Sequence, residues 1–125
     1  MPAIVNLPNG PFASDTTPVY TCRIVDSTGV GIPAADFLTL TLSICDTLTG
    51  AIVNNCTRDD ILNTGRGTID DEGNLTIQLE VGDTSMTGVP SASRVQRSLI
   101  IDWTTTTDLA GRHQANFVLT RLAGL

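Results

Sequence analysis

The 125-residue sequence contains no lysine, and all seven of its basic residues are arginines. Set against 13 acidic residues, these arginines leave a formal net charge of -6. An acidic surface repels phosphate backbones, which disfavours non-specific nucleic-acid binding by counterion release. The sequence also lacks the apolar run of about 18 residues that a membrane-spanning helix needs. We therefore expect partners that are neither nucleic acids nor membranes.

Aromatic residues are also scarce, at 4% of the sequence, and charged residues make up only 16%. Hydrophobic residues, at 41%, are too frequent for a disordered chain. A chain of this length suits one hydrophobic core, because single domains typically span about 50–200 residues. The composition therefore predicts one globular domain.

Cysteine is rare as well, and the three cysteines, Cys22, Cys45 and Cys56, cannot all pair within one chain. The first residues show neither the positive segment nor the apolar segment of a secretory signal peptide, so we expect a reducing compartment. In that setting we predict free thiols that pack as small hydrophobic side chains. A bridge between Cys45 and Cys56 across the intervening turn is the alternative.

Residues 1–18 contain four prolines and Gly10, a composition that suits neither a helix nor a central strand. We predict an extended N-terminal arm, followed by the main domain over residues 19–125. Exposed apolar side chains on this arm would be unfavourable unless they covered a surface. We therefore predict that the arm contacts a partner subunit through Ile4, Val5, Leu7 and Phe12. The alternatives are that the arm folds back on its own sheet edge or is disordered.

Alternation of apolar and polar residues predicts β-strands along most of residues 19–125. The clearest case spans residues 37–45, where leucine or isoleucine occupies every second position from Leu38 to Ile44. Similar patterns predict strands over residues 19–25, 51–53, 68–70, 74–81, 95–103 and 113–122. Their predicted inward side chains are Tyr20, Cys22, Ile24, Leu75, Ile77, Leu79, Val81, Leu99, Ile101, Trp103, Ala115, Phe117 and Leu119.

One helical turn is predicted over residues 57–63. Thr57 could cap its N-terminus, and Asp59 and Asp60 would then lie favourably in its first turn. About seven short strands, with turns at intervals of roughly 8–12 residues, indicate an all-β fold. We predict an immunoglobulin-like antiparallel β-sandwich with an extended N-terminal arm and at most one short helix. A small barrel is the competing architecture.

The candidates for chemistry are few, and we predict neither an enzyme nor a bound metal or cofactor. His113 is the sole histidine, and no nucleophile motif accompanies it. The acidic run 70–74 has oxygen ligands that suit calcium, but its spacing does not match the twelve-residue calcium loop, so we predict a solvated hairpin turn. Arg94, Arg97 and Arg112 are predicted to form surface ion pairs with the acidic excess rather than an anion site.

Four local features stand out between residues 19 and 122: the strand from Tyr20 to Val25, the D-x-x-G turn of Asp26-Ser27-Thr28-Gly29, the G-N-L hairpin of Gly73-Asn74-Leu75, and the late segment Arg112 to Phe117. In these fold-level motifs the chain resembles small immunoglobulin-like structural proteins of tailed bacteriophage virions. It carries over no catalytic residue.

This resemblance implies a non-enzymatic virion protein that assembles in the cytoplasm of the bacterial host. The leading hypothesis is a capsid decoration (cement) protein, a homo-oligomer that binds the major capsid protein or other virion subunits on the outer surface of the head. A head-to-tail connector, tail or baseplate component is the alternative. A carbohydrate-binding module is a hypothesis from another class, disfavoured by the scarcity of aromatic residues and by the inward parity of Trp103.

Overall fold

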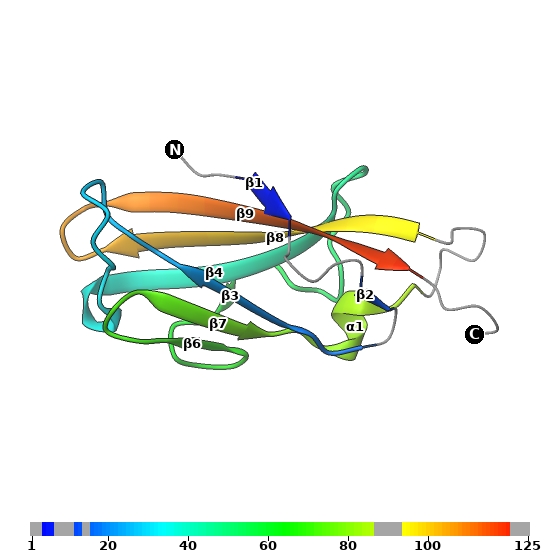
Figure 1. Cartoon of the computed structure of the whole chain (residues 1–125), viewed down its shortest axis with the longest axis horizontal. Helices are drawn as coiled ribbons and strands as arrows, with labels where there is room; N and C mark the ends of the chain where they lie inside the picture. The colour runs from blue at the N-terminus through cyan, green and yellow to red at the C-terminus, as the bar shows by residue number, and fades with distance from the viewer. Residues whose placement is uncertain (1–3, 7–11, 14–15, 87–93, 121–125) are drawn as a thin grey trace.

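Two β-sheets packed face to face form the fold (Figure 1). The computed structural model describes residues 4–6, 12–13, 16–86 and 94–120. The larger sheet has the order β1-β9-β8-β4-β5, with β2 also paired to β9. Its strands are β1 (Ile4–Asn6), β2 (Phe12–Ala13), β4 (Phe37–Asp46), β5 (Asp59–Asp60), β8 (Arg94–Thr105) and β9 (Ala110–Thr120). The smaller sheet has the order β3-β7-β6, formed by β3 (Val19–Arg23), β7 (Asn74–Gln78) and β6 (Gly67–Ile69).

The strand order is that of the immunoglobulin fold. The smaller sheet β3-β7-β6 corresponds to strands B, E and D, and β4-β8-β9 of the larger sheet corresponds to C, F and G. In the described part of the chain, two short helical segments interrupt the strands: a 3-10 turn, η1 (Ala34–Asp36), and a four-residue helix, α1 (Val81–Thr84). The predicted all-β, immunoglobulin-like sandwich is therefore confirmed.

The core lies between the sheets and consists of the side chains that alternate inward along each strand. Almost all the predicted inward residues are buried, including Leu42, Ile77, Leu99 and Phe117. The alternation of the sequence thus translates directly into one apolar layer.

Some predicted inward positions are wrong. Leu38 is 61% exposed, because the pairing of β4 with β8 shifts register between Phe37 and Thr39, and Phe37 enters the core instead. Val81 is exposed because the chain has left β7 and entered α1 there. Cys22 and Trp103 do pack against the core, as predicted, but each is only half-buried.

The helix predicted over residues 57–63 is also wrong. Arg58 and Asn63 have φ angles of 52°, in the left-handed region that a right-handed helix excludes. Asp59 and Asp60 instead form β5 and pair with β4. Their carboxylates therefore do not lie in the first turn of a helix, where a helix dipole would stabilise them. The strand predicted over residues 51–53 is reduced to a single bridge between Ile52 and Cys45.

Candidate functional site

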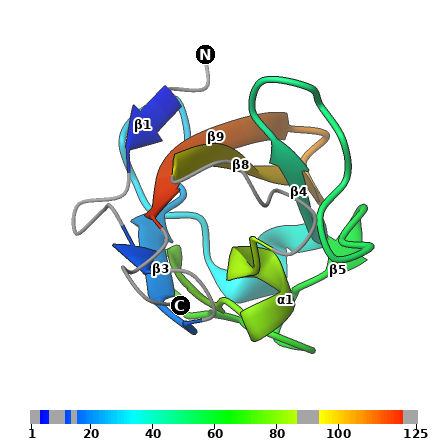
Figure 2. The same ribbon diagram turned by 90° about the vertical axis from the view of Figure 1, so that its right-hand side faces the viewer.

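The N-terminal arm lies along β9 and forms that edge of the larger sheet (Figures 1 and 2). Strand β1 runs parallel to β9 and pairs with residues 114–116, and β2 runs parallel to β9 beside residues 119–120. In this arrangement the arm folds back on the chain's own sheet edge, which is one of the alternatives given above. Contact between the arm and a partner subunit stays a prediction. Leu7 and the side chains of Ile4 and Val5 lie outside the described residues.

Among the described residues of the arm, Phe12 anchors it to the core. Its half-buried ring packs against the core, with a centroid 6.3 Å from that of Phe117 and a tilt of 55° between the ring planes. The hydroxyl group of Thr120 also donates to the carbonyl oxygen of Phe12 (3.4 Å). A tilted aromatic pair contributes about 0.5–1.5 kcal/mol beyond the area it buries. The arm therefore closes one flank of the core through a single aromatic side chain.

The arm is fixed again where it leads into β3. The backbone N–H of Thr16 donates to Oγ1 of Thr84 (3.0 Å), and the Thr84 hydroxyl group donates to the carbonyl oxygen of Thr16 (2.6 Å). Thr84 lies at the end of α1 and is fully buried. This reciprocal pair satisfies a buried hydroxyl group and ties the arm to α1.

Asp83, next to Thr84, is a fully buried carboxylate. It forms an ion pair with Arg66 and accepts hydrogen bonds from the backbone N–H of Glu80 (2.7 Å) and from Nδ2 of Asn54 (3.1 Å). Buried charges persist in proteins when they are paired and hydrogen-bonded in this way. The cluster therefore holds α1 in place at one end of the sandwich.

The prediction that Arg97 forms a surface ion pair is wrong. Only 6% of this residue is exposed, and its guanidinium group donates to the carbonyl oxygens of Asp83 (2.6 Å) and Ser85 (2.6 Å). The signal was present in the sequence, because Arg97 shares its parity on β8 with the buried Leu99 and Ile101. Burial lowers the pKa of the Arg97 guanidinium group. Arg112, by contrast, forms the predicted surface ion pair, with Asp102.

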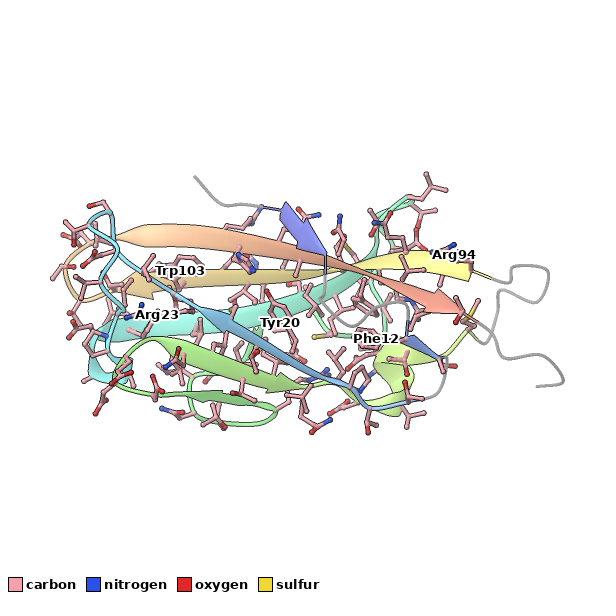
Figure 3. All side chains as sticks on the ribbon, viewed as in Figure 1. Phe12, Tyr20, Arg23, Arg94 and Trp103 are labelled. Atoms are coloured by element: carbon pink, nitrogen blue, oxygen red, sulfur yellow. The ribbon has the colours of Figure 1, made fainter. Side chains whose placement is uncertain are left out.

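A cleft of about 470 Å³ opens at the other end of the sandwich, between β3 and the start of β9. Figure 3 shows Trp103 and Arg23 at this end, far from Phe12. The residues around the cleft are Arg23, Ile24, Val25, Asp26, Ser27, Ile32, Trp103, Leu109, Ala110, Gly111, Arg112 and His113. Gly111 faces the indole of Trp103 so closely that a side chain there would overlap the ring. Trp103 thus packs against the core, as its position on the strand predicts, and also lines the cleft.

His113 lies at the inner wall of this cleft, and its Nε2 is 2.6 Å from the hydroxyl oxygen of Tyr20. Burial lowers the pKa of His113, and burial also raises the pKa of Tyr20. The pKa of the neighbouring Cys22 thiol is raised to about 11, again by burial. All three groups are therefore held in their neutral forms near pH 7, and the hydrogen bond links the two sheets.

The cysteines are free thiols, as predicted. Cys56 is buried, and its thiol group donates to the carbonyl oxygen of Leu42 (3.5 Å). Cys45 alternates with the inward Leu42 and Ile44, so it lies on the outer face of β4. Burial raises the pKa of the Cys56 thiol to about 12, which leaves it protonated. Its role is therefore that of a small core side chain.

The acidic run 70–74 forms the turn between β6 and β7. Oδ1 of Asp70 accepts hydrogen bonds from the backbone N–H groups of Glu72 (2.8 Å) and Asn74 (2.9 Å), and these bonds close the turn. Among the residues that the structure describes, no group of three or more metal-ligating side chains is gathered in one place. Within the same described ranges, no helix is long and apolar enough to cross a membrane.

The fold and the arm together define an immunoglobulin-like sandwich in which two short strands from the N-terminus pair with the last strand, β9. No family model matches this chain, and no curated protein does. Among solved structures, it is similar to the collagen-binding subdomain ACE19 of the Enterococcus faecalis surface protein ACE. The two share 8% identity and a TM-score of 0.24, over 94% of this chain and 93% of that chain.

Proposed function

We propose that this chain is a structural protein of a tailed-phage virion that binds the outer surface of the capsid as a decoration protein. The proposal starts from the resemblance of residues 19–122 to virion proteins with immunoglobulin-like folds. The observation that carries it further is the attachment of the arm to β9. A structural protein of this kind needs a surface that can join neighbouring subunits, and an edge strand that accepts added strands is such a surface.

The arm supports the proposal because it is held locally by short pairings. Strand β1 contributes three register pairs with β9 and β2 contributes two, and the chief described side-chain contact is Phe12 on Phe117. The same contacts can form with β9 of a second copy, since strand exchange between identical subunits preserves every bond it replaces. The proposal therefore includes a homo-oligomer linked through exchanged arms.

The experiment is a sedimentation assay with the full chain and purified particles of the phage that encodes it. The chain is mixed separately with expanded capsids and with isolated tails, and the bound fraction is measured after pelleting. We expect binding to capsids, and a mass above that of the monomer by light scattering. Binding to tails alone would favour the alternative assignment, a connector, tail or baseplate component. Binding to neither particle would refute a virion role.

A matched pair of variants separates the arm from the rest of the surface. Phe12→Ala removes the ring that packs on Phe117, and Ile52→Ala removes a half-exposed aliphatic side chain at a turn outside the arm. We expect the first variant to lower the bound fraction and the oligomer mass, and the second to leave both unchanged. Circular dichroism establishes that both variants are folded. Equal binding by both variants would show that the arm plays no part in attachment.

A further inference from the structure

The net charge of the chain is concentrated at one end of the sandwich. We call this the loop end: the loops 24–36, 70–73 and 106–109, with the adjoining ends of β3, β8 and β9 (Figure 1). It carries seven carboxylates, from Asp26, Asp36, Asp70, Asp71, Glu72, Asp102 and Asp108, and two guanidinium groups, from Arg23 and Arg112. The loop end thus has a net charge of -5, out of -6 for the whole chain.

Hydrogen bonds between the loops make the loop end a single preformed surface. The backbone N–H of Ile24 donates to the carbonyl oxygen of Gly73 (2.8 Å), and the N–H of Thr106 donates to the carbonyl oxygen of Asp36 (2.9 Å). Nε of Arg23 also donates to the carbonyl oxygen of Glu72 (3.1 Å). These bonds link the loop 24–36 to both of the other loops. A preformed surface loses little conformational entropy on binding.

Apolar side chains lie between these charges. Val25, Val30 and Leu109 are 41%, 60% and 50% exposed, respectively. Val25 and Leu109 also line the cleft beside Trp103. Exposed apolar groups gathered around a cavity and rimmed by charge are typical of a protein-binding site. The cleft is therefore part of the same surface.

The two arginines of the cleft do not make it positive. Arg112 forms an ion pair with Asp102 through Nε and Oδ1 (2.6 Å). Arg23 lies against the acidic turn 70–73 through its bond to the carbonyl oxygen of Glu72. Asp26 is itself fixed by the hydroxyl group (2.6 Å) and N–H (2.8 Å) of Thr28, and these bonds lower the pKa of its carboxyl group. The field at the loop end is therefore negative.

We propose that the loop end is a docking surface for a positively charged protein segment in which arginine or lysine alternates with aliphatic residues. The acidic rim attracts the cations and speeds association, and the aliphatic side chains cover Val25, Val30 and Leu109. One basic side chain enters the cleft, where its methylene groups pack on Trp103 and its cation interacts with the indole face. This surface is separate from the arm, at the opposite end from Phe12 (Figure 3).

Trp103 is the only tryptophan of the chain, so its fluorescence reports directly on the cleft. The full chain is titrated with a peptide of alternating arginine and leucine, and separately with a peptide in which glutamate replaces arginine. We expect saturable binding of the basic peptide with a change in Trp103 emission. The affinity should fall as salt rises from about 0.1 M to about 1 M, because the Debye length shrinks from about 10 Å to about 3 Å.

Paired charge variants locate the binding. Asp71→Asn combined with Glu72→Gln removes two exposed charges of the loop end, and Asp59→Asn combined with Asp60→Asn removes two exposed charges of β5. We expect the first pair to weaken binding about threefold or more and the second to leave it unchanged. An equal effect of both pairs, or equal binding of the glutamate peptide, would overturn the proposal. A third outcome would also overturn it: the basic peptide does not bind, a glycan does, and Trp103→Ala abolishes the glycan binding. The cleft would then be a carbohydrate site.

Discussion

The hydroxyl oxygen of Tyr20 lies 2.6 Å from Nε2 of His113 and joins β3 of one sheet to β9 of the other. Their rings are stacked, with centroids 6.2 Å apart and an interplanar angle of 19°. The tautomer of His113 decides which atom donates, but in either case the imidazole is neutral. Burial lowers the pKa of His113 below its ordinary value of 6.5, so protonation is easier in the unfolded chain than in the folded one.

Stability should therefore fall as the pH is lowered through the titration of His113. Below about pH 6.5 the unfolded chain gains a proton that the folded chain resists, and the free energy of unfolding decreases until the pH passes the lowered pKa of the folded state. The measurement is the midpoint of thermal unfolding between about pH 7.5 and about pH 5. His113→Gln should flatten this dependence. The cleft also contains Asp26, but hydrogen bonds from Thr28 lower the pKa of Asp26 below 3.8, outside this range.

Arg97 provides a second prediction, through the geometry of its guanidinium group. Arg97→Lys keeps the charge. An ammonium group, however, lacks the planar geometry with which the two terminal nitrogens of guanidinium donate to the carbonyl oxygens of Asp83 and Ser85. We expect a loss of about 1–3 kcal/mol in the free energy of unfolding, measured by urea denaturation. Arg94→Lys on the same strand, at an exposed position, should change it by less than about 0.5 kcal/mol. Equal effects would show that Arg97 acts only through its charge.

The sequence predicts the sandwich well because the signal of a half-buried strand is local. In β4 and β7, every second residue from Leu40 to Ile44 and from Leu75 to Ile77 is buried, as the alternation predicts. The failures occur where contacts distant in sequence override this signal. The shift that exposes Leu38 depends on pairing with β8, and β5 forms only because β4 lies beside it.

The candidate sites were harder to predict, for the same physical reason. Phe12 was predicted to contact a partner subunit. Its ring does pack on an apolar side chain, but this is Phe117 of the same sheet, and no local pattern specifies that contact. The cleft around Trp103 is lined by residues of β3, β8 and β9 and of the loops beside them, which are far apart in the sequence. Such a cleft depends on strand order and cannot be read from any one segment.

Gly31 allows the loop 24–36 to lie against the turn 70–73. A side chain at this position would overlap the carbonyl group of Glu72, so Gly31→Ala should force the two loops apart. Gly29 has a φ angle of 86° but open space around it, so Gly29→Ala tests backbone strain alone, at about 1–2 kcal/mol. We expect Gly31→Ala to lower the midpoint of urea unfolding more than Gly29→Ala does. The reverse order would show that the two loops are not in contact.

Gly111 has the corresponding role for Trp103. A methyl group at this position would overlap the Cζ2 side of the indole, so Gly111→Ala should push the ring away from β9. We expect a red shift of the tryptophan emission, because the displaced ring meets more water, and a loss of about 1–3 kcal/mol from overpacking. Ala51→Val adds bulk at an exposed position that does not line the cleft and should change neither quantity. If Gly111→Ala leaves both emission and stability unchanged, the indole does not pack against Gly111 of β9, and the two residues do not form a wall of the cleft together.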